Sequence, residues 1–168
     1  MKKDIFEKLQ LMGLNNLYDR FDFDKTDLEM FQKNFNGIFL DFKCEKFTIK
    51  DFINYSKLNK HDAHGWLKKI PMNYKIRLMG KCKVDIMKIK QLEVCFMIYI
   101  LISDMVLQEI FDLEYEIIDK FNDEMLDYID SYVRRQPKCK EPYLKDSMII
   151  EMFKDELNLN VKDIIIEY

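Results

Sequence analysis

The first 43 residues carry apolar side chains at the spacing of amphipathic helices. Ile5, Leu9 and Met12 recur at steps of four and three with polar residues between them, and this period marks one face of a helix. A break or bend is expected near Gly13 and the asparagines at 15 and 16, because these residue types favour turns. The N-terminus is therefore predicted to form an interrupted helix.

A second helix is predicted from Thr26 onwards. Thr26 and Glu29 have the spacing of a capping box, in which two side chains satisfy backbone N–H groups of the first helical turn. The apolar residues that follow stand at helical steps: Leu28, Phe31, Phe35, Ile38, Phe39 and Phe42. A broad stripe of this kind faces a protein core, so we assign it to packing and not to a cofactor pocket.

Residues 47–70, "FTIKDFINYSKLNKHDAHGWLKKI", have the pattern of two short helices joined by a turn. Thr48 precedes the first helix, whose buried side is formed by Ile49, Phe52 and Ile53. The turn is expected at residues 56–58, and Asn59 is a natural cap for the second helix. The second helix turns three apolar residues inward: Ala63, Leu67 and Ile70. Its outward face then holds Lys60, His61, His64 and Lys68.

After Pro71 the apolar period changes from that of a helix to two. Residues 75–78, "KIRL", and residues 81–86, "KCKVDI", alternate polar and apolar positions on either side of Met79 and Gly80. This alternation predicts a β-hairpin with one apolar face. Arg77, Lys81 and Lys83 would lie near the tip of the hairpin.

Two short helices that cross through a tight turn are the geometry that fits the second helix into the major groove of DNA. The stretch from Thr48 to Ile70 resembles the helix-turn-helix of the winged-helix DNA-binding family, above all in its Trp-Leu-Lys-Lys-Ile ending. With the hairpin as the wing, the resemblance covers residues 47–90. It implies a mainly α fold: a winged helix-turn-helix core with a short β-hairpin wing, flanked by N-terminal helices and a C-terminal acidic helical segment.

Charge is divided unevenly along the chain. The net charge of −3 is the sum of −1 over residues 1–43, +8 over residues 44–92 and −10 over residues 93–168. We interpret these ranges as N-terminal helices, a basic winged helix-turn-helix unit and an acidic helical segment, together forming one compact domain. A basic segment beside an acidic one predicts a patch that meets a polyanion; the alternative is that the lysines form a solvated face.

Seven residues are the candidate contacts with DNA: Lys60, His61, His64, Lys68, Arg77, Lys81 and Lys83. The lysines and the arginine are expected to neutralise phosphates, and the resemblance implies that those of the wing touch the backbone or the minor groove. The two histidines are candidates for base edges, because they would lie at the exposed start of the second helix and can both donate and accept hydrogen bonds. An exposed histidine pair without a function is the alternative.

The last third of the chain returns to helical spacing and is strongly acidic. Between Glu109 and Asp130 there are nine acids against Lys120 alone. Such a surface repels DNA, so we expect it to point away from the duplex or to meet a basic protein partner. The candidate partner-binding residues are Glu109, Asp112, Glu116, Asp123 and Asp127. Long apolar helices after a winged helix are a common plan for dimers, so we expect a homodimer; a monomeric core is the alternative.

The C-terminal end is predicted to hold one more helix and an ambiguous tail. Pro137 and Pro142 break the preceding helix, and apolar residues at helical steps extend from Leu144 to Leu157. The tail "NVKDIIIEY" is either a strand or a docking segment.

The sequence carries no motif typical of an enzyme, a metal site or a membrane segment. The four cysteines, at positions 44, 82, 95 and 139, have no close pair, which favours free thiols. No ligand spacing predicts zinc, and no phosphate loop, nucleophile elbow or other signature predicts a cofactor or catalysis. The longest apolar run, residues 94–102, is too short to span a bilayer, so we expect a cytoplasmic protein.

Two functions remain as expectations. The first is a protein that binds double-stranded DNA through the winged helix-turn-helix, as a transcriptional regulator or as an accessory factor in replication or partition. The second is a non-enzymatic protein-binding inhibitor or adaptor, whose acidic helices occupy a basic surface of a target. Charge reversal in the basic segment should abolish the first function, and neutralisation of the acids between residues 109 and 130 should abolish the second.

Overall fold

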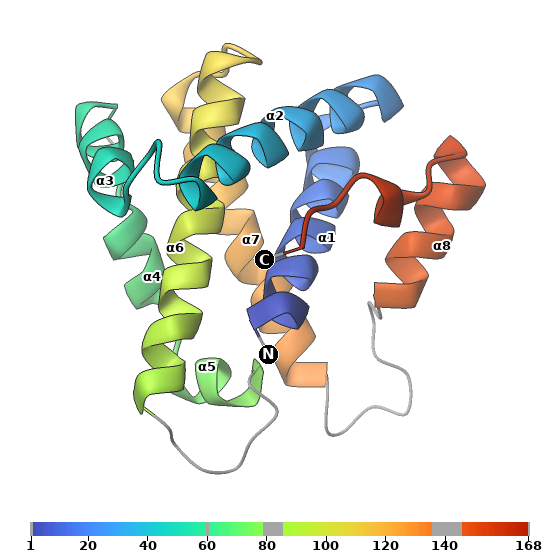
Figure 1. Ribbon diagram of the computed structural model, residues 1–168. Coiled ribbons are helices and arrows are strands. Elements are labelled where there is room, and N and C mark those ends of the chain that lie inside the picture. The colour runs from blue at the N-terminus through green and yellow to red at the C-terminus, as the bar shows by residue number, and fades with distance from the viewer. Residues whose placement is uncertain (1, 60, 79–85, 136–145, 168) are drawn as a thin grey trace.

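The computed structural model describes residues 2–59, 61–78, 86–135 and 146–167. Within these ranges the chain is helical and contains no strand (Figure 1). The elements are α1 (Lys2–Phe21), α2 (Lys25–Lys43), α3 (Ile49–Leu58), α4 (Ala63–Lys69), α5 (Met72–Leu78), α6 (Ile86–Glu109), α7 (Tyr115–Arg135), α8 (Asp146–Leu157) and the short 3₁₀ helix η1 (Val161–Asp163).

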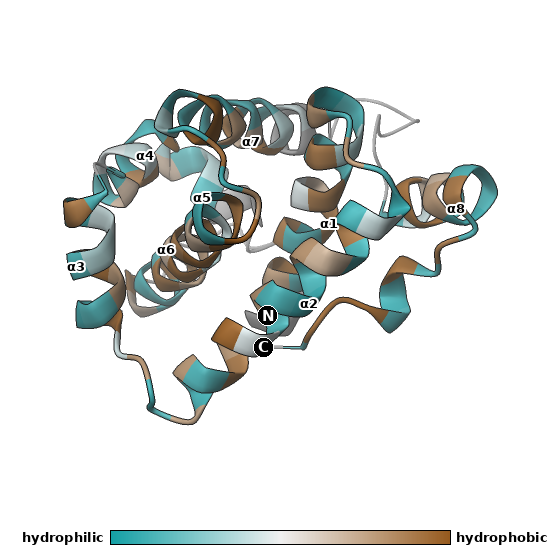
Figure 2. Ribbon diagram, turned by 90° about the horizontal axis from the view of Figure 1, so that it is seen from above, coloured by the Kyte–Doolittle hydropathy of each residue, from teal (hydrophilic) through white to brown (hydrophobic). Residues whose placement is uncertain are grey.

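Helix α6 is the centre of the fold. Its sequence is apolar around its whole circumference, and a helix of this kind is stable only when other elements cover every side. Residues 95–104 are all buried. Helices α1, α2, α3, α4, α5 and α7 each pack against α6, and the view from above shows it among them (Figure 2). The acidic segment therefore supplies the middle of the core, which the N-terminal helices and the basic segment surround.

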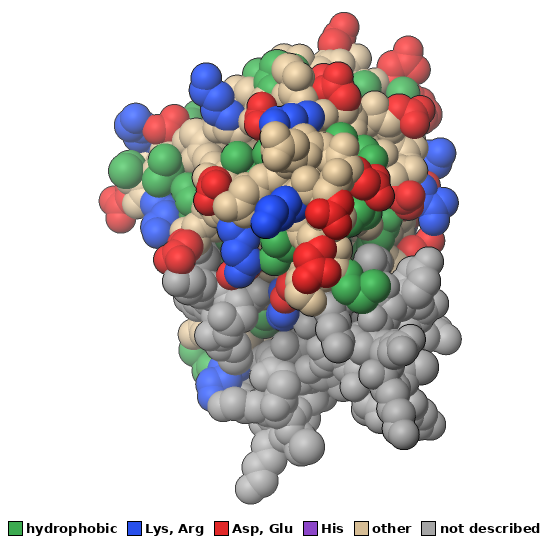
Figure 3. All heavy atoms as spheres, turned by 90° about the vertical axis from the view of Figure 1, so that its right-hand side faces the viewer, with side chains coloured by type: hydrophobic (Ala, Val, Ile, Leu, Met, Phe, Trp, Pro, Cys, Tyr) green, Lys and Arg blue, Asp and Glu red, His purple; other side chains and the backbone are tan. Residues whose placement is uncertain are grey.

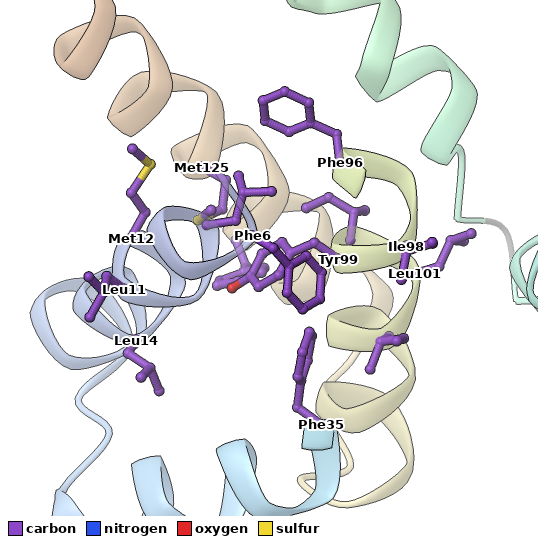
Figure 4. Packing of buried hydrophobic residues seen from close by; sticks show 14 of the residues in the cluster. Phe6, Leu11, Met12, Leu14, Phe35, Phe96, Ile98, Tyr99, Leu101 and Met125 are labelled. Atoms are coloured by element: carbon purple, nitrogen blue, oxygen red, sulfur yellow. The ribbon is translucent and has the colours of Figure 1, made fainter. Parts of the chain in front are cut away.

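Aromatic packing joins α1, α2 and α6 around Tyr99 (Figure 4). The ring centroid of Tyr99 lies 6.4 Å from that of Phe6 and 5.4 Å from that of Phe35. A Cβ atom at Gly13 would stand 1.6 Å from the Tyr99 hydroxyl oxygen. Gly13 thus permits close approach of α1 to α6, and the predicted break was wrong because α1 continues through it.

Helix boundaries in the first half of the chain match the sequence predictions in part. Thr48 caps α3, as expected, and forms a capping box with Asp51. Helix α2 instead begins after Asp24, which forms its capping box with Asp27, so the prediction of Thr26 as the cap was wrong. Asp24 offers a carboxylate two residues earlier, and a carboxylate is a strong N-cap acceptor.

The expected turn at residues 56–58 belongs to α3, which continues to Leu58. Asn59 ends α3, and its backbone N–H donates to the carbonyl of Tyr55. The cap of α4 is Asp62, whose side chain accepts a hydrogen bond from Gly65 N at 2.8 Å. The second helix therefore starts three residues later than its predicted cap implied.

The predicted β-hairpin wing, and with it the winged helix-turn-helix fold, is contradicted. Residues 75–78 belong to α5 and Ile86 begins α6, while residues 79–85 lie outside the described residues. The carbonyl of Pro71 accepts hydrogen bonds from the backbone N–H groups of Tyr74 and Lys75 at 3.0 and 3.2 Å, so proline starts a helix here. A four-residue alternation was too short to distinguish a strand from this helical turn.

One hydrophobic core draws residues from all three predicted segments. No helix in the described ranges is both long and apolar enough to cross a membrane. The described part of the predicted tail, residues 160–167, contains η1 and no strand, which agrees with the docking alternative: the carbonyls of Ile164 and Ile166 accept hydrogen bonds from Asn36 of α2 and Gln10 of α1. In Figure 1 this segment passes across α1.

Candidate functional site on helix α7

His61 lies inside the fold, so its predicted exposure at the start of the second helix was wrong. Its side chain is buried, with Nε2 2.8 Å from Oε1 of Gln108 and Nδ1 3.7 Å from Oδ2 of Asp104. The ring also lies against Tyr55 and Tyr115. His61 comes before Asp62, the cap of α4, and the connection from α3 turns it towards α6. The His61 ring is therefore surrounded by Gln108, Asp104 and two tyrosine rings and is not available to contact DNA bases.

Asp104 is the centre of this buried polar cluster. Its Oδ1 accepts a hydrogen bond from Asn122 Nδ2 at 2.9 Å, and the carbonyl of Asn122 accepts one from Trp66 Nε1 at 2.6 Å. Burial raises the pKa of the Asp104 carboxyl well above its usual range, and the Asn122 hydrogen bond opposes that shift in part. The cluster ties α4, α6 and α7 together, and Asp104 is too enclosed to meet a substrate (1% exposed).

The remaining predicted DNA contacts are only partly brought together. His64 and Lys68 are exposed one turn apart on α4. Arg77 lies in α5, and its side chain is not among those described. Lys60, Lys81 and Lys83 lie outside the described residues. Among the described side chains, His64 and Lys68 are thus the predicted DNA contacts that lie together on an exposed surface.

The acidic helix α7 lies beside α4, the helix predicted to enter DNA. Lys69 Nζ of α4 stands 2.7 Å from Asp123 Oδ1 of α7, and Trp66 bonds to the same helix. DNA binding required the acids to point away from the duplex, since carboxylates and phosphates repel each other. The observed packing instead places acidic side chains next to the proposed recognition helix.

Helix α7 is strongly two-sided. Its buried stripe consists of Ile118, Phe121, Met125 and Ile129. Its outer surface carries Glu116, Asp119, Asp123 and Asp127, which we call the acidic ridge; all four are exposed. In contrast, basic and acidic side chains are interspersed on the face seen from the side of α8 (Figure 3).

The predicted partner-binding residues fall into two groups. Glu109 accepts a hydrogen bond from the Tyr55 hydroxyl at 2.7 Å, and Asp123 pairs with Lys69. Burial and Glu109 raise the pKa of Tyr55, so that this hydroxyl keeps its proton and donates. Asp112, Glu116 and Asp127 are exposed and form no ion pair with any described side chain.

Two grooves flank α7. A groove of about 380 Å³ is lined by residues of α1, α7 and α8: Asn15, Asp19, Arg20, Asp127, Tyr128, Ser131 and Met152. A second groove, of about 340 Å³, lies towards α4 and α5 and is lined by Lys69, Ile70, Pro71, Tyr74, Leu126, Asp127, Ile129 and Asp130. Asp127 borders both grooves, so this carboxylate stands on the wall that separates them.

Tyr128 and Asn15 shape the first groove, and sequence reasoning missed their role. The Tyr128 hydroxyl accepts a hydrogen bond from Asn15 Nδ2 at 3.0 Å and donates one to Asp19 at 3.2 Å. Burial raises the pKa of Tyr128 to about 12. These residues are more than a hundred positions apart in the chain, so no local spacing could have brought them together.

Chemically the α7 surface offers exposed charge and two recesses whose linings mix polar and apolar residues. Among the described residues there is no group of His, Cys, Asp and Glu side chains that could hold a metal ion. Comparison with known proteins found no matching family, no similar curated protein and no similar solved structure. A proposal about function therefore rests on the geometry of this surface.

Proposed function

We propose that the protein acts without catalysis, as a protein-binding inhibitor or adaptor that docks a basic, amphipathic segment of its target on the acidic ridge of α7. The observation that carries this proposal is the position of Asp127 between two grooves. A segment with cationic side chains along its middle and apolar side chains at its edges matches that arrangement.

The charge of the ridge supports steering of a basic partner. Glu116, Asp119 and Asp127 are exposed and unpaired by the described residues. Complementary charges raise association rates and fix orientation, and added salt screens them. The apolar parts of the grooves, Met152 in the first and Ile70, Leu126 and Ile129 in the second, would then supply the contacts that give residence time, because rim charges alone contribute little net affinity.

Double-stranded DNA is the second candidate, and the exposed lysines of α3 and α4 favour it. Lys57 and Lys68 are exposed and have no ion-pair partner among the described residues. They remain able to neutralise phosphates. The neighbouring α7 acids weigh against this candidate, because they would lie within the reach of the same duplex.

A synthetic amphipathic peptide of Lys and Leu is a suitable probe for the first candidate. A length of about 14 residues spans about 21 Å as a helix, enough to cover the ridge from Glu116 to Asp127. The test compares two double charge reversals by fluorescence anisotropy. Glu116→Lys with Asp127→Lys changes the ridge, while Glu29→Lys with Asp155→Lys makes the same change of net charge on the exposed surfaces of α2 and α8.

The ridge variant should bind the peptide at least about tenfold more weakly than the control, which is about 1.4 kcal/mol. Equal losses in the two variants would mean that the peptide senses only net charge, and the proposal would be wrong. A labelled duplex of about 30 base pairs, titrated at about 50 and 200 mM salt, tests the second candidate. Salt-sensitive DNA binding that is lost with Lys57→Glu and Lys68→Glu would favour DNA instead.

A further inference from the structure

A chain of hydrogen bonds fastens the connection between α3 and α4 to α6. Asn59 Nδ2 donates to the carbonyl of Tyr55 at 3.0 Å, which leaves Asn59 Oδ1 to accept from Gln108 Nε2 at 3.0 Å. Gln108 therefore turns its oxygen, Oε1, towards His61 Nε2 at 2.8 Å. Because a carbonyl oxygen only accepts hydrogen bonds, Nε2 carries a proton. The network thus assigns this ring nitrogen as a donor.

The other ring nitrogen of His61 faces Asp104. Nδ1 stands 3.7 Å from Asp104 Oδ2, and the two side chains are 2% and 1% exposed. Oδ1 already accepts a hydrogen bond from Asn122, whereas Oδ2 accepts none from any described residue. A neutral ring with its proton on Nε2 turns a lone pair towards Oδ2, and an ionised carboxylate would then be buried without compensation. One proton, on Nδ1 or on Oδ2, removes this conflict.

The groups around the pair add negative charge to its surroundings. Titratable side chains lie on every side: Tyr55 on α3, Asp62 at the start of α4, Tyr99 and Glu109 on α6, and Tyr115 and Asp119 on α7. Helix α1 approaches through Gly13, beside the Tyr99 hydroxyl. Burial raises the pKa of the three tyrosine hydroxyls, so that they stay neutral. Burial also raises the pKa of Asp104, and the charge of Asp119 adds to that shift.

The pair lies where α4 is docked on the rest of the fold. Helix α4 begins two residues after His61 and packs against α6 and α7 (Figure 1). Its Trp66 donates to the carbonyl of Asn122, the residue that bonds to Asp104. Lys69, at the end of α4, lines the second groove together with residues of α7. The docking of α4, and with it one wall of that groove, therefore depends on this cluster.

We propose that His61 and Asp104 form a proton-dependent latch, which holds the connection between α3 and α4 on α6 while the pair carries one proton and favours local opening when that proton is lost. The latch is a conformational device inside the fold, and it is independent of the function proposed for α7.

The direction of the effect follows from the number of protons bound. The closed pair holds one proton. In the opened connection both side chains are hydrated, and a carboxyl with a reference pKa of about 3.9 and a histidine with one of about 6.5 bind none above about pH 7.5. The closed state then binds one proton more than the open state, so the opening constant rises with pH, by at most about tenfold per pH unit.

The single tryptophan of the chain reports on the latch. The indole N–H of Trp66 is bonded to α7 only while α4 is docked, and NMR measures its exchange with solvent at about pH 7, 8 and 9, relative to free indole at each pH. Local opening in the parent should increase at least about tenfold over this range. In Asp104→Asn it should change less than about twofold, because a side-chain amide can donate to His61 Nδ1 at every pH.

Asp119→Asn is the matched control. It removes a neighbouring exposed carboxylate but leaves the pair intact, so its pH dependence should follow that of the parent. The backbone amide of Tyr99 in the core serves as the reference for global unfolding.

Three results would overturn the latch. One is an equal pH dependence of Trp66 exchange in the parent and in Asp104→Asn. Another is a Trp66 N–H as strongly protected as the Tyr99 amide at every pH, because global unfolding alone would then expose it. The third is read from the ¹⁵N signals of the His61 ring in the intact parent, and so does not depend on a variant that folds: a neutral ring with its proton on Nδ1 and none on Nε2 would contradict the hydrogen-bond network.

Discussion

The basic segment, residues 44–92, and the acidic segment, residues 93–168, both leave most of their described charges exposed, but they differ in sign and form ion pairs with each other where they pack. Lys69 and Lys75 of the basic segment pair with Asp123 and Glu93 of the acidic one. The surplus acids of α7 remain exposed. Separation of charge along a sequence is therefore not separation in space: charges of opposite sign pair where the two segments pack, and exposed charges of both signs remain on the rest of the surface.

Among changes at the contact of α4 with α6 and α7, which joins the two segments, a substitution of Trp66 is expected to lower the free energy of unfolding most. Its buried ring packs on Phe96 of α6, and its Nε1 bonds to α7. Trp66→Ala should lower the free energy of unfolding by about 3–5 kcal/mol, as for other large aromatic residues in cores. Urea denaturation followed by circular dichroism measures the change, and a loss below about 1 kcal/mol would show that α4 is not anchored there.

Disruption of the ion pair between Lys75 and Glu93 should have the next largest effect on the free energy of unfolding. Lys75 is buried, and its Nζ lies 2.7 Å from Glu93 Oε1. Glu93→Gln leaves a buried ammonium without its counter-charge and should cost about 2–3 kcal/mol. Lys75→Met should cost less than about 1 kcal/mol, because the carboxylate that it leaves unpaired is partly exposed (29%) and can be hydrated. Equal losses in both variants, by the same denaturation assay, would contradict this account.

Asp104 should make the free energy of unfolding depend on pH. Its pKa is raised in the folded state, so the native protein holds this proton more tightly than the unfolded chain does. Its contribution to stability is then present below the unfolded pKa, near 4, and is lost as pH rises towards the folded pKa. Asp104→Asn should remove that loss, and its gain over the parent should grow from pH 5 to pH 8 in urea titrations. If the stability gain of Asp104→Asn over the parent shrinks over this range, the pKa of Asp104 is not raised in the folded state.

The exposed pair between Lys69 and Asp123 should have the smallest effect. Both side chains are about half exposed (53% each), and such pairs contribute about 0.2–1 kcal/mol. Lys69→Met should therefore change the free energy of unfolding by less than about 1 kcal/mol. A thermodynamic cycle with Asp123→Asn gives the coupling energy directly, and a value above about 2 kcal/mol would mean that this contact, and not Trp66, holds α4 on α7.

Local signals predicted the helices of this chain better than their arrangement. The Thr48 cap and the apolar stripe of α2 were recognisable, because each lies within a few turns of one helix. The apolar run of α6 was also recognisable in the sequence, and residues 95–102 of it are buried. The wing failed because alternation over four residues carries little information, and Pro71 started a helix instead. Polar residue type suggested an exposed His61, but Asp104 and Gln108, more than forty positions away, enclose it.

Sequence reasoning found the acids of the candidate site but not its shape. Glu116 and Asp127 were selected from charge alone, and both are exposed. The grooves on either side of Asp127 combine α7 with α1, α8 and the α4–α5 region. Helical period indicates which face of α7 is buried, but it does not indicate which helices will stand beside that face.

The most direct test of the central claim is a map of where a basic ligand binds. The ¹⁵N-labelled protein would be titrated with the Lys and Leu peptide, and the amide chemical shifts followed by NMR. The account predicts saturable shifts concentrated at residues 116–131 of α7 and at groove residues such as Asn15 and Tyr74. Saturable shifts centred on α3, or weak shifts spread over all acidic surfaces without saturation, would contradict it.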